Sequence, residues 1–157
     1  MLGPGVLVVG YGNQLRGDDG AGPEVAALLR EDFEAAGAKV ISAHQLTPEL
    51  AVDVAEHEMV VFVDAASDGG PAGTVSLEPL EAPQGQLAGS FWHFVSPCAL
   101  LALARDLYGA TPAAFLVSVA VESTDDGVGL SPRVSQAVPV AAQAVLSALQ
   151  GEPARSC

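Results

Sequence analysis

Short segments rich in apolar residues alternate along this chain with longer segments in which apolar residues recur at intervals of three and four. Four short segments rich in apolar and β-branched residues have the composition and length of strands in a parallel sheet. These predicted strands cover residues 5–10, 39–43, 59–64 and 115–121, and residues 74–77 predict a short edge strand. Apolar residues at intervals of three and four predict amphipathic helices between the strands. The predicted helices cover residues 23–34, 48–56, 97–109 and 132–149.

The first predicted helix has an apolar stripe, and the others have recognisable starts. The stripe consists of Val25, Leu28, Leu29 and Phe33. A hydroxyl residue followed by proline precedes each of the other helices, which makes Thr47, Ser96 and Ser131 the expected N-caps. Pro139 predicts a kink in the last helix. Residues 78–94 show no periodicity and predict a long surface loop, a length typical of functional segments.

Strands that alternate with helices predict an α/β fold. We expect a three-layer arrangement, with a mainly parallel twisted sheet of about five strands and helices on both faces. Because the sequence has no repeat or linker, residues 1–157 are expected to form a single domain, in which residues 151–157 are a loose tail. If the first strand lies between the second and third, the loops after the first and third strands open at the same edge. Open α/β sheets bind their ligands at that edge.

The composition narrows the classes of function. Half of the residues are hydrophobic but only 5% are aromatic, so we expect a core built mainly from Val, Leu and Ala. The net charge of −13 opposes binding to nucleic acid or to an anionic membrane surface. It suits a basic protein partner or a cation, or serves only solubility. Cys98 and Cys157 form no paired motif, and no signal peptide or membrane span is evident, so we expect a cytoplasmic protein.

Two acidic residues follow the first and third predicted strands. Asp19 lies beside Asp18 in a glycine-rich loop, and Asp64 closes an apolar run. If these loops open side by side, we expect the carboxylates of Asp19 and Asp64 to meet. Paired carboxylates bind a cation, or perturb each other so that one keeps its proton at neutral pH. The simpler interpretations are a tight turn with solvated acids at Asp19 and a turn cap at Asp64.

Histidine and cysteine residues near the same edge offer further ligands. His93 lies in the long loop before a predicted helix, and Cys98 falls in the first turn of that helix, where the dipole favours a thiolate. Imidazole with the two carboxylates suits nickel or zinc, whereas a thiolate favours softer metals. His44 closes the second predicted strand and is expected to face the same edge. A packed or solvated side chain is the simpler interpretation of His93.

Two other chemistries find weaker support. The glycine-rich loop departs from the dinucleotide-binding pattern because Leu15 stands where a third glycine is required, and its carboxylates oppose a pyrophosphate. Cys98 and His93 are near each other in sequence, but no third group is recognisable that would orient the imidazole of a cysteine protease. The chain has no GxSxG nucleophile elbow.

The order and spacing of four motifs resemble the endopeptidases that mature nickel–iron hydrogenases. The motifs lie at residues 10–22, at Val63-Asp64-Ala65, at Ser96-Pro97 and at residues 127–132. The first of them, Gly10-Tyr11-Gly12-Asn13 with Leu15-Arg16-Gly17-Asp18-Asp19-Gly20-Ala21-Gly22, is similar to the opening signature of the family. The resemblance spans nearly the whole chain, and it implies the same α/β fold.

The resemblance implies an endopeptidase, aspartic-type or metal-assisted, that removes the C-terminal extension of the hydrogenase large-subunit precursor after nickel insertion. It implies that Asp19 and Asp64 are the catalytic pair and that, together with His93, they bind the nickel of the precursor. The substrate therefore supplies the nickel, and no permanent cofactor is expected. Cys98 stands where relatives have a histidine directly after Ser-Pro, and it is the alternative third ligand.

Further expectations concern the substrate. Gly12, Asn13 and His44 are expected to bind it. The partner is the hydrogenase large-subunit precursor, with no nucleic acid and no membrane. The alternative function is a binding protein of the same fold that escorts the precursor without cutting it.

Overall fold

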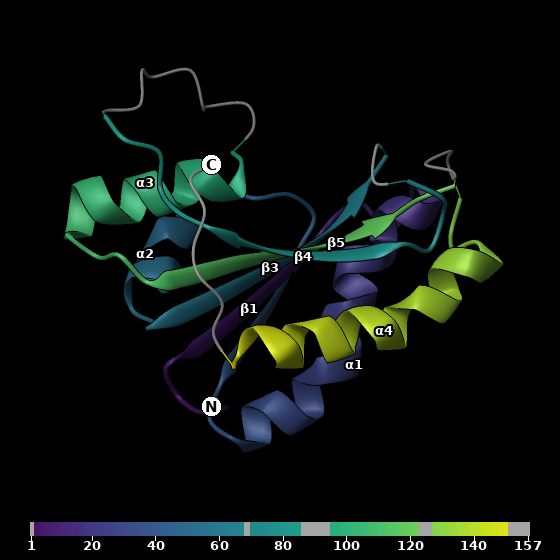
Figure 1. The fold of residues 1–157 in the computed structure, drawn as a ribbon, viewed down its shortest axis with the longest axis horizontal. Helices are drawn as coiled ribbons and strands as arrows, with labels where there is room; N and C mark the ends of the chain where they lie inside the picture. Colours follow the sequence, from purple (N-terminus) through teal and green to yellow (C-terminus); the bar gives the residue numbers. More distant parts are fainter. Residues whose placement is uncertain (1, 68–69, 86–94, 123–126, 151–157) are drawn as a thin grey trace.

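A computed structural model of the chain describes residues 2–67, 70–85, 95–122 and 127–150. Within these ranges, one five-stranded sheet lies between two pairs of helices (Figure 1). The strands are β1 (Val6–Tyr11), β2 (Lys39–Ala43), β3 (Met59–Ala66), β4 (Val75–Leu80) and β5 (Ala113–Ala120). The helices are the 3-10 turn η1 (Gly17–Gly20), α1 (Ala21–Ala35), α2 (Leu50–Ala55), α3 (Pro97–Tyr108) and α4 (Pro132–Ala148). None of these helices is both long and apolar enough to cross a membrane.

The strand order is β2-β1-β3-β5-β4, and all neighbours are parallel except β4 and β5. The predicted α/β class with a mainly parallel sheet is confirmed. β1 lies between β2 and β3, so the loops after β1 and β3 open at the same edge of the sheet. The predicted edge strand is longer than expected, because β4 continues to Leu80 through Pro79. An edge strand tolerates proline because one of its sides needs no N–H donor.

Two hydrophobic layers enclose the sheet (Figure 1). Helices α1 and α4 cover one face, and α2 and α3 cover the other. Side chains of β1 alternate between the two layers: Val8 packs under α1 and α4, and Leu7 and Val9 pack under α2 and α3. The described core consists mainly of Val, Leu and Ala, as expected from the composition.

Two details of α1 differ from the prediction. The helix begins at Ala21 rather than near Pro23. Pro23 is accommodated in the first turn, where the backbone N–H groups have no helical partner to lose. Leu28 does not belong to the buried stripe, since it is 52% exposed. The buried positions Val25, Leu29 and Phe33 follow one another at intervals of four, and Leu28 lies beside that line.

The predicted N-caps have three outcomes. Ser96 caps α3, because its Oγ accepts a hydrogen bond from Ala99 N at 3.1 Å. Ser131 occupies the N-cap of α4, but its side chain makes no capping bond. Thr47 was wrongly predicted, since α2 begins at Leu50 after a turn in which backbone carbonyls accept the first bonds. The predicted tail, residues 151–157, lies outside the described ranges.

Candidate active site

Three neighbouring strands carry polar side chains near their carboxyl ends, and these side chains point toward one face of the sheet. Phe62, two residues before Asp64 in β3, packs in the layer under α2 and α3, so strand alternation points Asp64 to that face. Ser118 of β5 is the register partner of Asp64. Tyr11, at the end of β1, packs partly in the same layer as Phe62. The sheet register therefore places a phenol, a carboxylate and a hydroxyl side by side.

Hydrogen bonds fix the carboxylate of Asp64 from both sides. The hydroxyl of Tyr11 donates to Asp64 Oδ2 at 2.9 Å. Ser118 Oγ donates to Asp64 Oδ1 at 3.0 Å. Hydrogen bonds to an ionised acceptor are the stronger kind, so the two donors hold the carboxylate in one orientation at the mouth of the sheet.

The electrostatic environment of Tyr11 links Asp64 to Asp19. Burial raises the pKa of the Tyr11 phenol above its ordinary value, and the charge of Asp64, its hydrogen bond and the charge of Asp19 raise it further. The phenol therefore stays protonated and acts as a hydrogen-bond donor at neutral pH. Because both carboxylates act on one phenol, they lie on the same side of the molecule.

Glycines allow the loop between β1 and α1 to bring Asp19 to this place. Gly12 has a φ of 147°, and a side chain there would collide with the backbone carbonyl of Asp19. Gly10 and Gly22 lie where β1 and α1 approach so closely that a Cβ atom would strike backbone carbonyls. Asn13 N then donates to Asp19 Oδ2 at 2.7 Å. The glycines serve close backbone packing, which accounts for the motif without a bound phosphate.

Asp18 has a structural role, unlike its neighbour Asp19. Its side chain is buried, at 1% exposure. The carboxylate accepts hydrogen bonds from Ser131 N at 2.6 Å, from Ser131 Oγ at 2.8 Å and from Glu122 N at 2.9 Å. It therefore joins η1 to the residue after β5 and to the start of α4, and the hydroxyl of Ser131 is directed toward Asp18.

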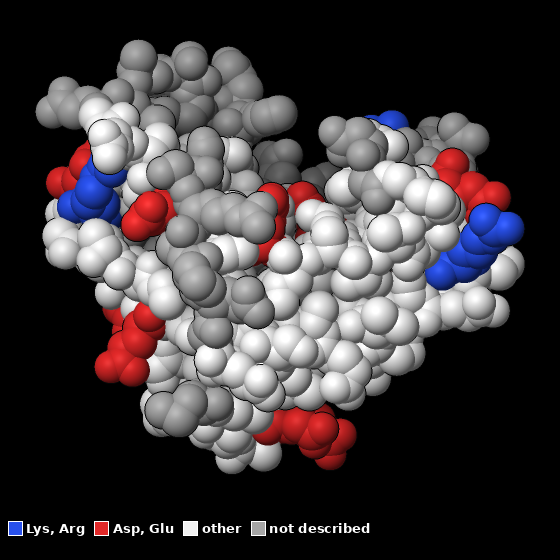
Figure 2. Space-filling model, viewed as in Figure 1, with Lys and Arg blue, Asp and Glu red and all other residues white. Residues whose placement is uncertain are grey.

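Asp19 and Asp64 line one cavity of about 360 Å³, here called the carboxylate cavity. Its other lining residues come from the ends of β1 and β2 and from the start of α3; they are Tyr11, Gly12, His44, Gln45, Leu46, Val95, Ser96 and Pro97. On the face drawn in Figure 2, red carboxylate groups lie at several separate places, and one of these is inside a hollow at the upper edge. Asp19 and Asp64 therefore line one cavity at the C-terminal edge, as expected, and their roles in catalysis and metal binding stay predictions.

Neither candidate for the third metal ligand, His93 or Cys98, is among the described residues that line the carboxylate cavity. His93 lies outside the described residues, so its role stays a prediction. Cys98, the alternative, is half-buried against the layer under α2 and α3, is disulfide-bonded, and does not line the carboxylate cavity. His44 does line the cavity. In the described part of the chain, no group of three or more His, Cys, Asp and Glu residues is placed to hold a metal ion.

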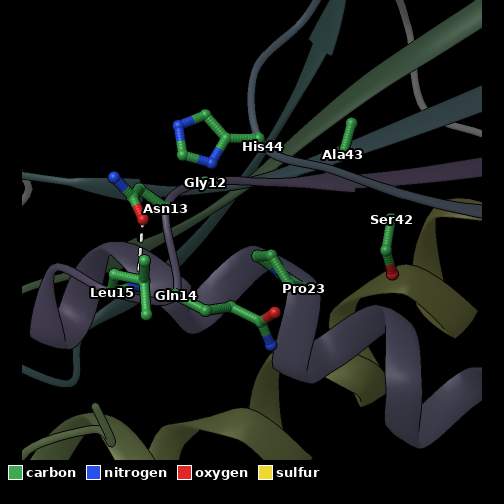
Figure 3. Close-up of a pocket in the computed structure, with 8 residues that line it drawn as sticks. All are labelled: Gly12, Asn13, Gln14, Leu15, Pro23, Ser42, Ala43 and His44. Carbon is green, nitrogen blue, oxygen red and sulfur yellow. Dashed lines mark hydrogen bonds between the residues drawn. The ribbon is translucent and has the colours of Figure 1, made fainter.

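A second cavity, of about 260 Å³, lies next to the first. Its lining residues are Gly12, Asn13, Gln14, Leu15, Pro23, Ser42, Ala43 and His44 (Figure 3). The three residues expected to bind substrate, Gly12, Asn13 and His44, all belong to it, and their role stays a prediction. Gly12 and His44 line both cavities, so the two spaces adjoin.

Sequence reasoning missed three residues of this site. Tyr11 and Ser118 were not singled out, because their closeness to Asp64 depends on strand register. The signal available for Tyr11 was its position directly after the first apolar run. Asp18 was considered only as a neighbour of Asp19, and no local pattern announces partners more than 100 residues away.

Comparisons with known proteins agree on one family. A family model described as hydrogenase maturation protease, HycI, matches residues 23–148. The match includes Asp64 and the start of α4, and it begins after Asp19. No curated protein matches the chain.

Solved structures extend the likeness over most of the chain. The hydrogenase 2 maturation peptidase from a Thaumarchaeota archaeon is 33% identical, with a TM-score of 0.66 over 94% of this chain and 99% of its own. The hydrogenase maturating endopeptidase HybD from E. coli is 25% identical, with a TM-score of 0.68 over 92% of this chain and 91% of its own. The HycI protease from Thermococcus kodakarensis shares the fold, with a TM-score of 0.71 at 21% identity over 94% of both chains.

Proposed function

Since the chain belongs to the hydrogenase maturation protease family, we propose that it removes the C-terminal extension of a nickel–iron hydrogenase large-subunit precursor. Members of this family are peptidases, which are hydrolases. The observation that carries the proposal is the cavity lined by Asp19 and Asp64 at the carboxyl edge of the sheet. Two carboxylates that converge from the loop after β1 and from the end of β3 suit a substrate with an exposed positive ion.

We infer that the nickel already inserted in the precursor is the feature that the enzyme recognises. Carboxylate oxygens and an imidazole form a donor set that suits a divalent metal of this kind. Asp19 and Asp64 supply the oxygens, and His93 supplies the imidazole. Because nickel arrives with the substrate, the protein needs no metal of its own, and an unloaded precursor lacks the feature that the carboxylates bind.

The chemistry of cleavage follows from how the two carboxylates are held. Both oxygens of Asp64 accept hydrogen bonds, from Tyr11 and Ser118, so this carboxylate is fixed in orientation. Asp19 accepts one from Asn13 N at Oδ2, and within the described ranges its Oδ1 accepts none. Asp19 Oδ1 is therefore the better placed atom to accept a proton from the attacking water. Binding of the nickel beside this group positions the scissile peptide.

The test compares two forms of one substrate. The purified chain is incubated with a large-subunit precursor that has been loaded with nickel and with the same precursor free of nickel, and intact mass is measured over time. We expect the extension to be lost only from the loaded form. Equal shortening of both forms would reject recognition of nickel. Binding of the loaded precursor without shortening would instead support the escort function.

A further inference from the structure

The two most exposed large hydrophobic residues of the described chain lie beside the candidate active site. Val128 is 86% exposed and Leu15 is 65% exposed. Single exposed apolar residues are ordinary on protein surfaces. Two of them brought together from opposite ends of the sequence, next to a cavity, are more informative, because contiguous exposed apolar surface marks interaction sites.

Backbone hydrogen bonds hold the two residues close together. Gly127 N donates to Leu15 O at 2.8 Å, and Gly17 N donates to Gly127 O at 2.9 Å. The loop after β1 and the loop before α4 are thus paired at this point, and Val128 is the next residue after Gly127. Asp18 strengthens the same junction through Ser131 and Glu122. These hydrogen bonds therefore fix the backbone that carries Leu15 and Val128.

Leu15 also connects this patch to the candidate active site. It lines the second cavity, which adjoins the carboxylate cavity through Gly12 and His44 (Figure 3). None of the described residues that line the second cavity is an acid, a lysine or an arginine, although the chain carries a net charge of −13. Its polar groups include the amides of Asn13 and Gln14, which match the hydrogen-bonding groups of a peptide backbone.

We propose that Leu15, Val128 and the second cavity form the docking surface for an uncharged, extended segment of the precursor next to its scissile bond. An apolar side chain of that segment packs against Leu15 and Val128, and its backbone lies along the second cavity. The identity of this partner rests on the proposed function. This surface would bind the peptide through apolar contacts and hydrogen bonds, so binding does not depend on basic residues, of which the chain has few.

Binding is measured separately from cleavage, so that the two proposals can fail independently. The probe is a nickel-loaded large-subunit precursor with its C-terminal extension, titrated into the full chain in a calorimeter. Every chain in this titration, with or without a change at the docking surface, also carries Asp64→Asn, which is expected not to cut the probe. The variants are Leu15→Asp, Val128→Asp and the uncharged Leu15→Ser, and Leu28→Asp is the matched control on α1, where the leucine is 52% exposed. Since the substituted side chains are exposed, all variants should unfold at the wild-type midpoint.

We expect Leu15→Asp and Val128→Asp to raise the dissociation constant at least about tenfold, and Leu15→Ser to raise it in the same direction. Leu28→Asp should remain within about twofold of the wild type. Wild-type affinity in both Leu15 variants would overturn the docking surface, as would failure of the wild-type chain to bind the precursor. Binding with the expected pattern but without cleavage would refute the proposed enzyme function and leave the docking surface supported.

Discussion

Replacing Asp18 by Asn should destabilise the protein, whereas replacing the adjacent Asp19 by Asn should not. The buried carboxylate of Asp18 uses both oxygens, one toward Ser131 N and the other toward Glu122 N and Ser131 Oγ. Asparagine offers one acceptor oxygen and one donor nitrogen. In both amide orientations, the nitrogen therefore faces a backbone N–H, and one of the three bonds is lost.

The size of the effect follows from the bonds that are lost. A hydrogen bond to a charged group contributes about 1.5–3 kcal/mol, and an unsatisfied buried donor adds to the loss. We therefore expect Asp18→Asn to lower the free energy of unfolding by about 2–4 kcal/mol, which corresponds to about 5–15 °C in Tm for a domain of this size. Asp19→Asn keeps an oxygen for Asn13 N and should lower the free energy of unfolding by less than about 1 kcal/mol.

The assay is urea unfolding followed by circular dichroism, with both variants measured beside the wild type and cleavage of the precursor measured in parallel. Asp18→Asn should unfold at lower urea with an unchanged slope. Asp19→Asn should unfold with the wild type but fail to cut. An unchanged midpoint for Asp18→Asn, or an equally large loss for Asp19→Asn, would refute the assignment of a structural role to one acid and a functional role to the other.

Three further predictions concern the strand ends and the helix that packs on them. Asp64→Asn should lower the cleavage rate at least about 100-fold with an unchanged unfolding midpoint, and a fully active variant would remove Asp64 from the site. The variant Tyr108→Phe leaves Tyr11 as the sole tyrosine of the chain. Because burial and Asp64 raise the pKa of Tyr11, no tyrosinate absorbance should develop in this variant at about pH 10. Tyrosinate absorbance at that pH would contradict the buried hydrogen bond. Gly22→Ala should destabilise the fold by more than about 1 kcal/mol in the same urea assay, because its Cβ would strike backbone carbonyls; wild-type stability would refute the close packing of α1 on β1.

The sequence carried enough information for the sheet and for half of the site. Valine-rich runs closed by polar residues predict parallel strands, and parallel strands bring their carboxyl ends to one edge. Asp64 could therefore be placed at the mouth of the sheet from its position alone. Asp19 could be placed there only on the condition that β1 lies between β2 and β3, which the strand order satisfies.

The remaining parts of the site depend on contacts that no local pattern encodes. Tyr11 and Ser118 become neighbours of Asp64 only through the register of three strands. Asp18 also depends on distant contacts, because its partners Glu122 and Ser131 lie more than 100 residues later in the sequence. The Ser-Pro pattern also predicts a side-chain cap at Ser131, but in the structure this hydroxyl donates to Asp18 and makes no capping bond.

Nickel-edge anomalous diffraction from crystals soaked with nickel(II) would locate a bound ion directly. We expect a single strong peak in the carboxylate cavity, within bonding distance of oxygens of both Asp19 and Asp64, with His93 as the third protein ligand. The peak should disappear in Asp64→Asn. A peak that touches neither carboxylate, or no peak in the cavity of the wild-type protein, would contradict the idea that these two acids share one metal ion.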